Sequence, residues 1–126
     1  MRRLLIGLCL ILLFASCEKT NSLAGKTFAA FGYHVDEKNI AGMHFDGYDA
    51  YYVYRFIDEV RAERTTRKYS AKGEIIGDIE PCTYTYDYPI IEITYTPSYS
   101  DKEITVQGEF LDKKTFRINK SDYHLQ

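Results

Sequence analysis

The chain has 126 residues, which is enough for one domain with a single hydrophobic core. It carries 18 acidic and 16 basic residues, a balance that does not favour binding to nucleic acid or to an anionic membrane surface. With 12 Tyr, 7 Phe and no Trp, the composition suits a β-rich fold, because a Tyr ring packs while its hydroxyl reaches water or a partner.

The first 16 residues have the pattern of a secretory leader. Arg2 and Arg3 precede the apolar run Leu4–Phe14, which is too short to span a bilayer, since a spanning helix needs about 20 residues. Small residues follow this run. Together these features predict a helical signal peptide over residues 1–16. An ordinary signal peptide without a lipid and an uncleaved anchor are the alternatives.

The segment Leu13–Cys17 resembles the lipobox of bacterial lipoproteins. The resemblance implies cleavage before Cys17 and acylation of that cysteine, with residues 17–24 as a polar tether. Each buried methylene of an acyl chain stabilises membrane attachment by about 0.8 kcal/mol, so several chains anchor a protein durably. We therefore expect a lipid-anchored protein of the cell envelope that meets the membrane only through its lipid. Glu18 favours the outer membrane over the inner one, and the periplasmic and surface faces both stay open.

The first elements after the tether are a predicted strand and a predicted loop. Residues 25–35 predict a strand with Phe31 and Tyr33 on one face and Phe28 on the other. Residues 36–49 contain Asn, Gly and many charges, so they predict a long connection, and long connections are often mobile or functional.

The next residues predict three more strands of uneven clarity. Residues 51–57 are apolar on both faces apart from Arg55, so the pattern does not assign their inward face. Residues 60–69 predict a charged strand, although they also contain helix formers. Residues 70–81, which Gly73 and Gly77 interrupt, predict a short bent strand.

Residues 82–96 show the clearest alternation in the chain. One face carries Cys82, three tyrosines, two isoleucines and Tyr95, while Thr, Asp and Glu occupy the other face. Pro89 cannot donate to a strand ladder, so this stretch predicts a hairpin that turns near residues 87–90. Because Cys82 is the one cysteine of the domain and shares the apolar face, we expect a buried small hydrophobe without an internal disulfide.

The end of the chain predicts two more strands. Residues 104–110 and 114–118 alternate between apolar and polar side chains, and residues 120–126 read as a polar tail that frays. Seven or eight short strands linked in sequence predict an all-β domain over residues 25–119, either an antiparallel meander β-barrel or a sandwich. A closed barrel would remove the exposed edges that Tyr- and Ile-rich strands present in an open sheet.

Three segments of the domain resemble small lipocalin-like lipoproteins of Bacteroides-type bacteria. These segments are Leu23–Phe28, the Tyr-Thr-Tyr-Asp-Tyr-Pro stretch at 84–89, and Gly108–Phe110 followed by Thr115–Arg117. The resemblance implies a compact meander barrel behind a lipid-attached cysteine.

The sequence contains no recognisable catalytic or cofactor motif. His34, His44 and His124 are not spaced as metal ligands, and nucleophile-elbow, phosphate-loop and dinucleotide patterns are absent. We therefore expect a protein that is not an enzyme and binds no cofactor or nucleic acid.

Two groups of residues are candidates for binding. The predicted ligand-lining set is aromatic and consists of Tyr52, Tyr54, Phe56, Tyr84, Tyr86 and Tyr95, because an eight-stranded barrel can hold one small ligand. The predicted anion-binding rim consists of Arg61, Arg64 and Arg67; on a strand Arg61 and Arg67 share one face, and Arg64 and Lys68 share the other. A solvated face paired with Glu59 and Glu63 is the alternative reading of these arginines.

We expect a membrane-tethered lipoprotein whose barrel binds a small apolar or aromatic ligand. The alternative is an interaction protein, either an inhibitor or an accessory subunit of an envelope complex. That alternative rests on the 36–49 connection and the loop that carries Tyr99, because loops on a rigid scaffold often bind partners.

Overall fold

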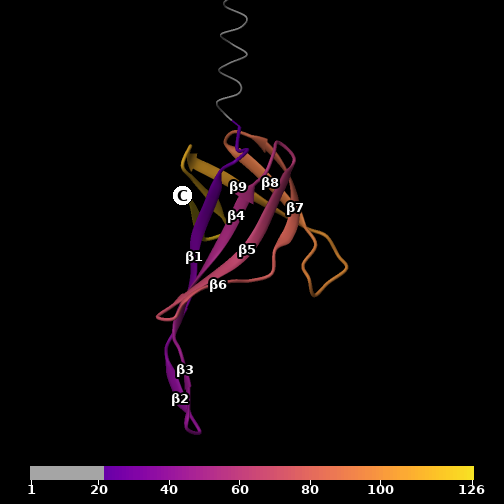
Figure 1. Cartoon of the computed structure of the whole chain (residues 1–126). Coiled ribbons are helices and arrows are strands. Elements are labelled where there is room, and N and C mark those ends of the chain that lie inside the picture. The colour runs from indigo at the N-terminus through magenta and orange to yellow at the C-terminus, as the bar shows by residue number, and fades with distance from the viewer. Residues whose placement is uncertain (1–21) are drawn as a thin grey trace, which may run out of the picture.

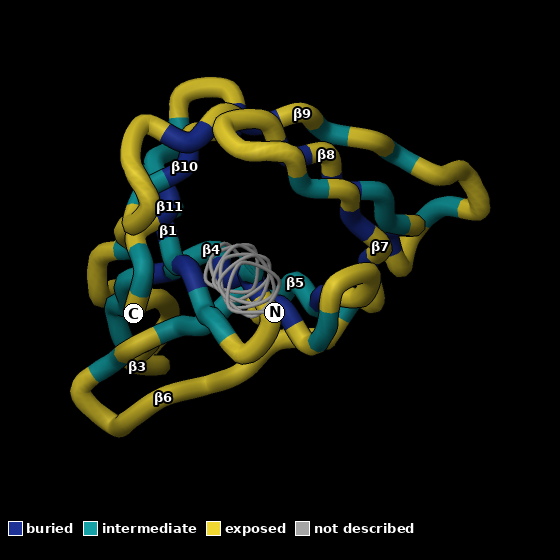
Figure 2. The backbone as a smooth tube through the Cα atoms, turned by 90° about the horizontal axis from the view of Figure 1, so that it is seen from above, coloured by how far each residue is buried: buried dark blue, intermediate teal, exposed yellow. Residues whose placement is uncertain are grey.

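A computed structural model describes residues 22–126, which form a closed antiparallel β-barrel of eight strands (Figure 1). Each strand pairs with the next barrel strand along the chain, and the last pairs with the first, so the fold is the predicted meander and not a sandwich. Figure 2 shows these strands closing around one axis. The barrel strands are β1 (Thr27–Val35), β4 (Tyr48–Phe56), β5 (Arg61–Ser70), β7 (Glu80–Asp87), β8 (Ile90–Tyr95), β9 (Ile104–Asp112), β10 (Thr115–Ile118) and β11 (Ser121–Leu125).

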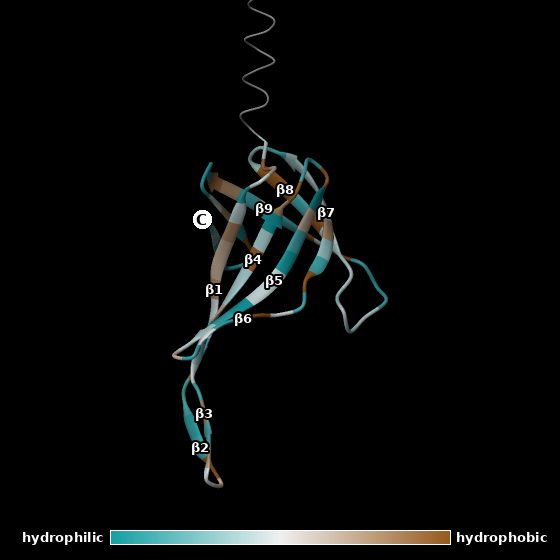
Figure 3. Ribbon diagram, viewed as in Figure 1, coloured by the Kyte–Doolittle hydropathy of each residue, from teal (hydrophilic) through white to brown (hydrophobic). Residues whose placement is uncertain are grey.

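Three short strands lie outside the closed barrel. β2 (Lys38–Ile40) and β3 (Met43–Phe45) pair only with each other, and they form a hairpin that extends away from the barrel (Figure 1). We call residues 36–47 the arm. β6 (Gly73–Ile76) pairs with the last four residues of β5 and is the edge strand of the sheet. Figure 3 shows hydrophobic residues along β6 and near the tip of the arm.

The prediction of a long loop at 36–49 is wrong, because residues 36–47 form the arm and Tyr48 and Asp49 begin β4. Ala41 and Gly42 have φ values of 52° and 81°, which suit the two central residues of a tight hairpin turn. Ile40 then pairs with Met43, and Lys38 pairs with Phe45. The sequence offers little alternation here because no core lies beside the strands.

The described domain is longer at both ends than residues 25–119. Leu23 is 2% exposed and packs into the core, so the predicted tether 17–24 is wrong at that residue. The frayed tail predicted at 120–126 is also wrong, because residues 121–125 form β11. Tyr123 is 7% exposed and faces the core, and β11 pairs with both β10 and β1. The predicted signal peptide and Cys17 lie outside the described residues.

Aromatic and aliphatic side chains fill the half of the barrel where Ser22 lies. The largest fully buried side chains are Phe28, Phe56, Phe116, Ile91 and Ile93. The Phe28 ring lies 5.9 Å from Phe56 and 5.0 Å from Phe116, centroid to centroid. Such pairs contribute about 0.5–1.5 kcal/mol each beyond the burial of their surface. These rings therefore occupy this half of the interior.

The prediction that Phe31 and Tyr33 share a face is wrong. The register of β1 against β4 shifts between these two residues, so Phe31 lies opposite Tyr51 and Tyr33 lies opposite Ala50. A β-bulge of this kind moves the following side chains to the other face of the sheet. Phe31 therefore points outward and is 55% exposed, while Tyr33 shares the inner face with the buried Ala50.

No helix among residues 22–126 is long and apolar enough to cross a membrane.

Candidate functional site

The two ends of the barrel differ in how they are filled. At the end where Ser22 lies, Leu23 covers the core, and the Gly25 N–H donates to the Phe56 carbonyl at 2.8 Å. The Gln126 N–H donates to the Thr27 carbonyl at 2.9 Å, which holds the last residue against β1. We call this the closed end, and the opposite end, where the arm leaves the barrel, the open end (Figure 1).

At the open end, strands β1, β4 and β5 extend past the point where β7 begins. Glu80, the first residue of β7, lies opposite Arg64, and four further residues of β5 pair with β6 instead. The inner face of this extension is rich in tyrosine and carries Lys68, while Arg64 of β5 and Tyr95 of β8 lie at its border. We call the set the tyrosine mouth; it consists of Tyr33, Tyr48, Tyr52, Arg64, Lys68 and Tyr95.

The tyrosine mouth is positioned by strand register. Tyr52 lies opposite Thr66, and Lys68 lies opposite Ala50, which is completely buried on the inner face. Tyr52, Thr66 and Lys68 nevertheless stay partly exposed, unlike the phenylalanines of the closed end. Solvent therefore reaches the inner face of the barrel at its open end.

The tyrosines of the mouth pack against one another and against a glycine. The Tyr33 ring lies 6.1 Å from Tyr48 and 6.4 Å from Tyr52, and a hydrogen bond with Tyr48 raises the pKa of Tyr33. A Cβ atom at Gly32 would lie 2.9 Å from the Tyr52 ring, which is closer than such contacts allow. Gly32 therefore lets the Tyr52 ring lie flat against β1.

The two cations of the mouth have different partners. The Arg64 guanidinium carbon lies 3.9 Å from the centroid of the Tyr95 ring, and its Nη1 lies 3.5 Å from Oε1 of Glu80. Lys68 Nζ lies 4.9 Å from the Tyr48 ring centroid, and no carboxylate of residues 22–126 lies within ion-pair distance of it. Arg64 is thus partly neutralised, whereas Lys68 brings an uncompensated charge to the inner face.

The predicted ligand-lining residues are divided between two parts of the barrel. Tyr52 and Tyr95 belong to the mouth. Tyr54, Phe56 and Tyr84 are buried in the core, and burial raises the pKa of Tyr84 to about 12. The sixth residue, Tyr86, lies on the side of the closed end, where its ring centroid is 5.2 Å from that of Phe110.

The predicted anion rim does not come together. Arg61 lies exposed at the β4–β5 turn, where its Nε donates to Asp58 Oδ2 at 2.7 Å. The register confirms the predicted alternation, with Arg64 and Lys68 inside and Arg61 and Arg67 outside. Sequence reasoning missed Tyr33, Tyr48 and Lys68 as a group, because the bulge and the arm hide which face they share.

Cys82 is a buried free thiol, as the alternation predicts. Burial raises its pKa to about 11, and this outweighs the nearby charge of Arg64. The thiol therefore stays protonated at neutral pH, and a protonated thiol is a poor nucleophile.

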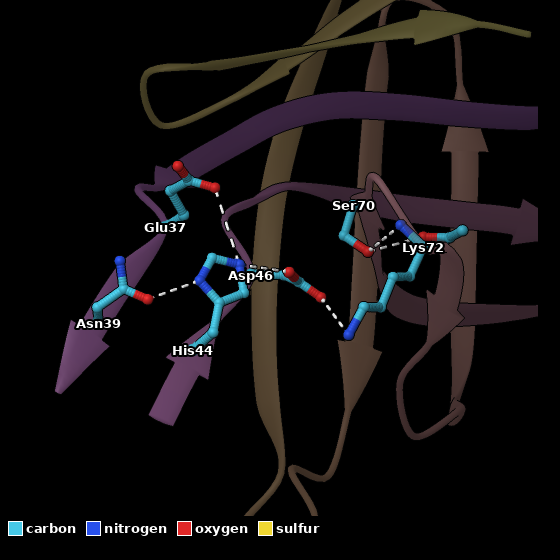
Figure 4. A network of polar contacts seen from close by, with 7 residues as sticks. Glu37, Asn39, His44, Asp46, Ser70 and Lys72 are labelled. Atoms are coloured by element: carbon cyan, nitrogen blue, oxygen red, sulfur yellow. Dashed lines mark hydrogen bonds and ion pairs between the residues drawn. The ribbon is translucent and has the colours of Figure 1, made fainter. Parts of the chain in front are cut away.

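A polar network connects the base of the arm to the β5–β6 turn (Figure 4). His44 Nε2 lies 3.0 Å from Asp46 Oδ1, and Asp46 Oδ2 lies 3.2 Å from Lys72 Nζ. The hydrogen bond from Lys72 lowers the pKa of Asp46. Within residues 22–126 no group of His, Cys, Asp and Glu side chains is arranged to hold a metal ion.

The hollows on the outer surface of the barrel include two that lie over its longer strands. One, of about 910 Å³, lies over β1, β4 and β5 next to the end of β11. The other, of about 590 Å³, follows β5, β7 and β8. The first hollow contains no residue of the tyrosine mouth, and the second shares only Tyr95 with it. Strand register places most of the lining of both on the outer face of the sheet.

Comparisons with protein-family models, with curated proteins and with solved structures find no match for this chain.

Proposed function

We propose that this chain is a lipid-anchored binding protein whose tyrosine mouth holds a small aromatic or apolar ligand. The observation that carries the proposal is the partial exposure of Tyr33, Tyr48 and Tyr52 at the open end, against the complete burial of the phenylalanines at the closed end. Side chains that face inward and still meet solvent offer a surface that a ligand can cover.

The chemistry of the mouth suits a flat ring. Tyr33, Tyr48 and Tyr52 present ring faces and edges that favour offset or edge-to-face contact with another ring. Their hydroxyls offer hydrogen bonds that orient a ligand without a large charge. Barrels of eight strands have an interior wide enough for side chains or one small ligand, which limits the ligand to a small molecule.

A neutral fluorescent probe, N-phenyl-1-naphthylamine, tests ligand binding in the mouth. Thr66 faces inward between Arg64 and Lys68, so Thr66→Trp fills the mouth and weakens probe affinity by about tenfold or more, which equals a loss of about 1.4 kcal/mol. Thr85→Trp is the matched control, because Thr85 is exposed on the outer face of β7 and should leave affinity unchanged. Failure of the wild type to bind, or equal binding by Thr66→Trp, contradicts the proposal.

The anchor is the second part of the proposal, and it rests on the lipobox resemblance of Leu13–Cys17. Ser22 donates a hydrogen bond to Glu59 at the closed end, so an anchor before Ser22 would leave the tyrosine mouth directed away from the membrane. Metabolic labelling with an alkyne fatty acid should mark the wild type and the control Cys82→Ala but not Cys17→Ala. Label retained in Cys17→Ala contradicts lipidation at this residue, and fractionation of the envelope tests the outer-membrane location.

A second candidate function, docking to an envelope protein, is favoured by the exposed face of the arm. Ile40, Met43 and Phe45 are 56%, 60% and 48% exposed, and their pairing places them with Lys38 on one face of the hairpin. A two-stranded hairpin with an uncovered apolar face suits contact with an apolar patch on another protein.

Cross-linking and pull-down from intact envelopes separates the two functions. A stoichiometric partner that is lost on deletion of residues 40–47 favours docking, and Ile40→Ser with Met43→Ser should lose it too. Asn39→Ser, on the opposite face of the arm, is the control. Recovery of no partner, together with a bound small molecule in native mass spectrometry, favours the ligand-binding function.

A further inference from the structure

The outer hollow of about 910 Å³ has an apolar floor formed by small side chains. Ala29 on β1 lies opposite Val53 on β4, and both point away from the barrel interior. On the same outer face of β4, Arg55 lies on one side of Val53 and Tyr51 lies on the other. The floor is low because small residues lie between larger neighbours on the same face.

Val53 shows that this floor is shielded from water. Although the side chain faces outward, it is only 4% exposed, which is the burial of a core residue. Outward-facing side chains of a small barrel normally meet solvent. The walls of the hollow therefore rise high enough to cover an aliphatic side chain, and a ligand on this floor would lose contact with water.

Aromatic rings form one wall of the hollow. Tyr51 lies between Phe31 and Tyr69, with ring centroids 5.6 Å and 5.7 Å away and an interplanar angle of 80° in both pairs. These edge-to-face contacts hold the Tyr51 ring in one orientation. The wall is thus preformed, and a flat ligand could pack on it without reordering the side chains.

Arg67 supplies a buried donor that lacks an acceptor. Its Nε is shielded from solvent and has no hydrogen-bond partner among the described residues. The nearest carboxylate oxygen, Oε1 of Glu74, lies 3.8 Å away, which is too long for a hydrogen bond. A buried donor without an acceptor is destabilising, so an oxygen atom brought by a ligand would relieve this cost.

The hollow carries charges of both signs, and its two cations are Arg67 and Lys26. Lys26 lines the hollow and adds a second cation, and the ion pair of Arg67 with Glu74 is long. Asp49 also lines it, but its Oδ1 lies 2.5 Å from His34 Nδ1 and is engaged there. The guanidinium of Arg67 can hold both oxygens of a planar carboxylate.

We propose that this outer hollow binds a small carboxylate with a flat apolar body. The carboxylate accepts from Arg67, and the body lies on Ala29 and Val53 against the ring of Tyr51. The site is separate from the tyrosine mouth, because its lining faces the opposite side of β1, β4 and β5. The proposal therefore holds or fails independently of ligand binding in the mouth.

Methyl NMR with 2-naphthoate as the probe locates the binding. Ala29 lies on the floor of the hollow, and Ala50 is buried on the inner face near the mouth, so their methyl groups report on the two sites separately. Titration should shift the Ala29 and Val53 methyl signals and leave Ala50 unchanged. 2-Naphthamide, which has the same ring system without the charge, should bind at least about tenfold more weakly, because it brings one acceptor and no charge to Arg67.

Arg67→Lys tests the role of the guanidinium, because lysine keeps the charge and lacks the Nε donor. This variant should bind 2-naphthoate about tenfold more weakly and 2-naphthamide with little change. Arg55→Lys is the matched control. Arg55 is on β4 and faces outward like Arg67, but it is paired with Glu63 at 2.7 Å and does not line the hollow.

Ala29→Phe fills the floor and should abolish binding of both compounds, while an unshifted Ala50 methyl signal shows that the barrel is folded. Absence of Ala29 and Val53 shifts in the wild type overturns the proposal. Equal binding of 2-naphthoate by wild type and Arg67→Lys overturns it too.

Discussion

Phe28 and Phe31 lie three residues apart on β1 and face opposite sides of the barrel wall. Phe28 is fully buried against the rings of Phe56, Phe110 and Phe116, whereas Phe31 is 55% exposed. The side chains are chemically identical, so their contributions to stability differ through burial and through the number of rings that each contacts.

We expect Phe28→Ala to lower the free energy of unfolding by about 3–5 kcal/mol, because it leaves a cavity among packed rings. Phe31→Ala should cost less than about 1 kcal/mol, since it removes a side chain that already meets water. Urea denaturation of both variants measures the difference. Equal losses would contradict the core described above.

His34 makes the stability of the arm base depend on pH. Its Nδ1 lies 2.5 Å from Asp49 and its Nε2 lies 2.8 Å from Asp36, and hydrogen bonds to Asp49 and then Asp36 raise its pKa. A raised pKa means that the charged ring stabilises the folded state. This stabilisation is fully present below the unfolded pKa of about 6.5 and is lost as pH rises through the folded pKa.

The wild type should therefore show a His34 NMR titration midpoint above 6.5, and its urea midpoint should fall as pH rises through that value. His34→Gln should remove this part of the pH dependence. If the variant keeps the same dependence as the wild type, the two carboxylates do not act through His34.

At the scale of single elements, the arm and the barrel are held together differently. The arm is a two-stranded hairpin whose β2 and β3 residues are all exposed, and its link to β5 and β6 is the exposed contact of Asp46 with Lys72. Surface ion pairs of this kind contribute at most about 1 kcal/mol. The barrel strands are instead joined by long ladders and a shared core.

Replacing residues 38–45 by Asn-Gly should leave the barrel folded and change the free energy of unfolding by less than about 1 kcal/mol. The dipeptide suits a tight hairpin turn, so the ends of the arm can still be joined. Thermal and urea unfolding measure the result. A loss of several kcal/mol would mean that the arm supports the barrel and is not an added element.

At the scale of the whole molecule, the barrel is closed by its last strand. β11 pairs with β10 along four residues and with β1 through Phe28–Leu125 and Ala29–His124. Tyr123 on β11 stacks on Phe116 with ring centroids 4.9 Å apart and an interplanar angle of 7°. Closure thus joins residues almost a hundred positions apart in the chain.

Ending the chain after Lys120 should abolish cooperative unfolding, because it exposes the edges of β1 and β10 and removes a core ring. Exposed strand edges favour aggregation, so the shortened protein should also form oligomers. Ending it after Leu125 is the control, since that removes only Gln126. A compact monomer with a sharp thermal transition in the first variant would contradict the importance of closure.

Local alternation by itself determined much of the strand pattern. The hairpin at 82–96 has its predicted turn, and Cys82, Tyr84, Ile91 and Ile93 are buried on its inner face. The prediction that Arg64 and Lys68 share one face is likewise correct. Period-two alternation depends only on neighbouring residues, so it can be read without knowing what a strand packs against.

Tertiary structure alone decided the site and the closure. Tyr33 joins Tyr52 in the mouth because a bulge arises where β1 pairs with β4, and Ser121–Leu125 becomes a strand because β1 and β10 lie on either side of it. Alternation places Arg64 and Arg67 on opposite faces, but the barrel decides which face is inside, and their partners Tyr95 and Glu74 come from other strands. These outcomes depend on register between distant segments, which the core enforces and which no local pattern specifies.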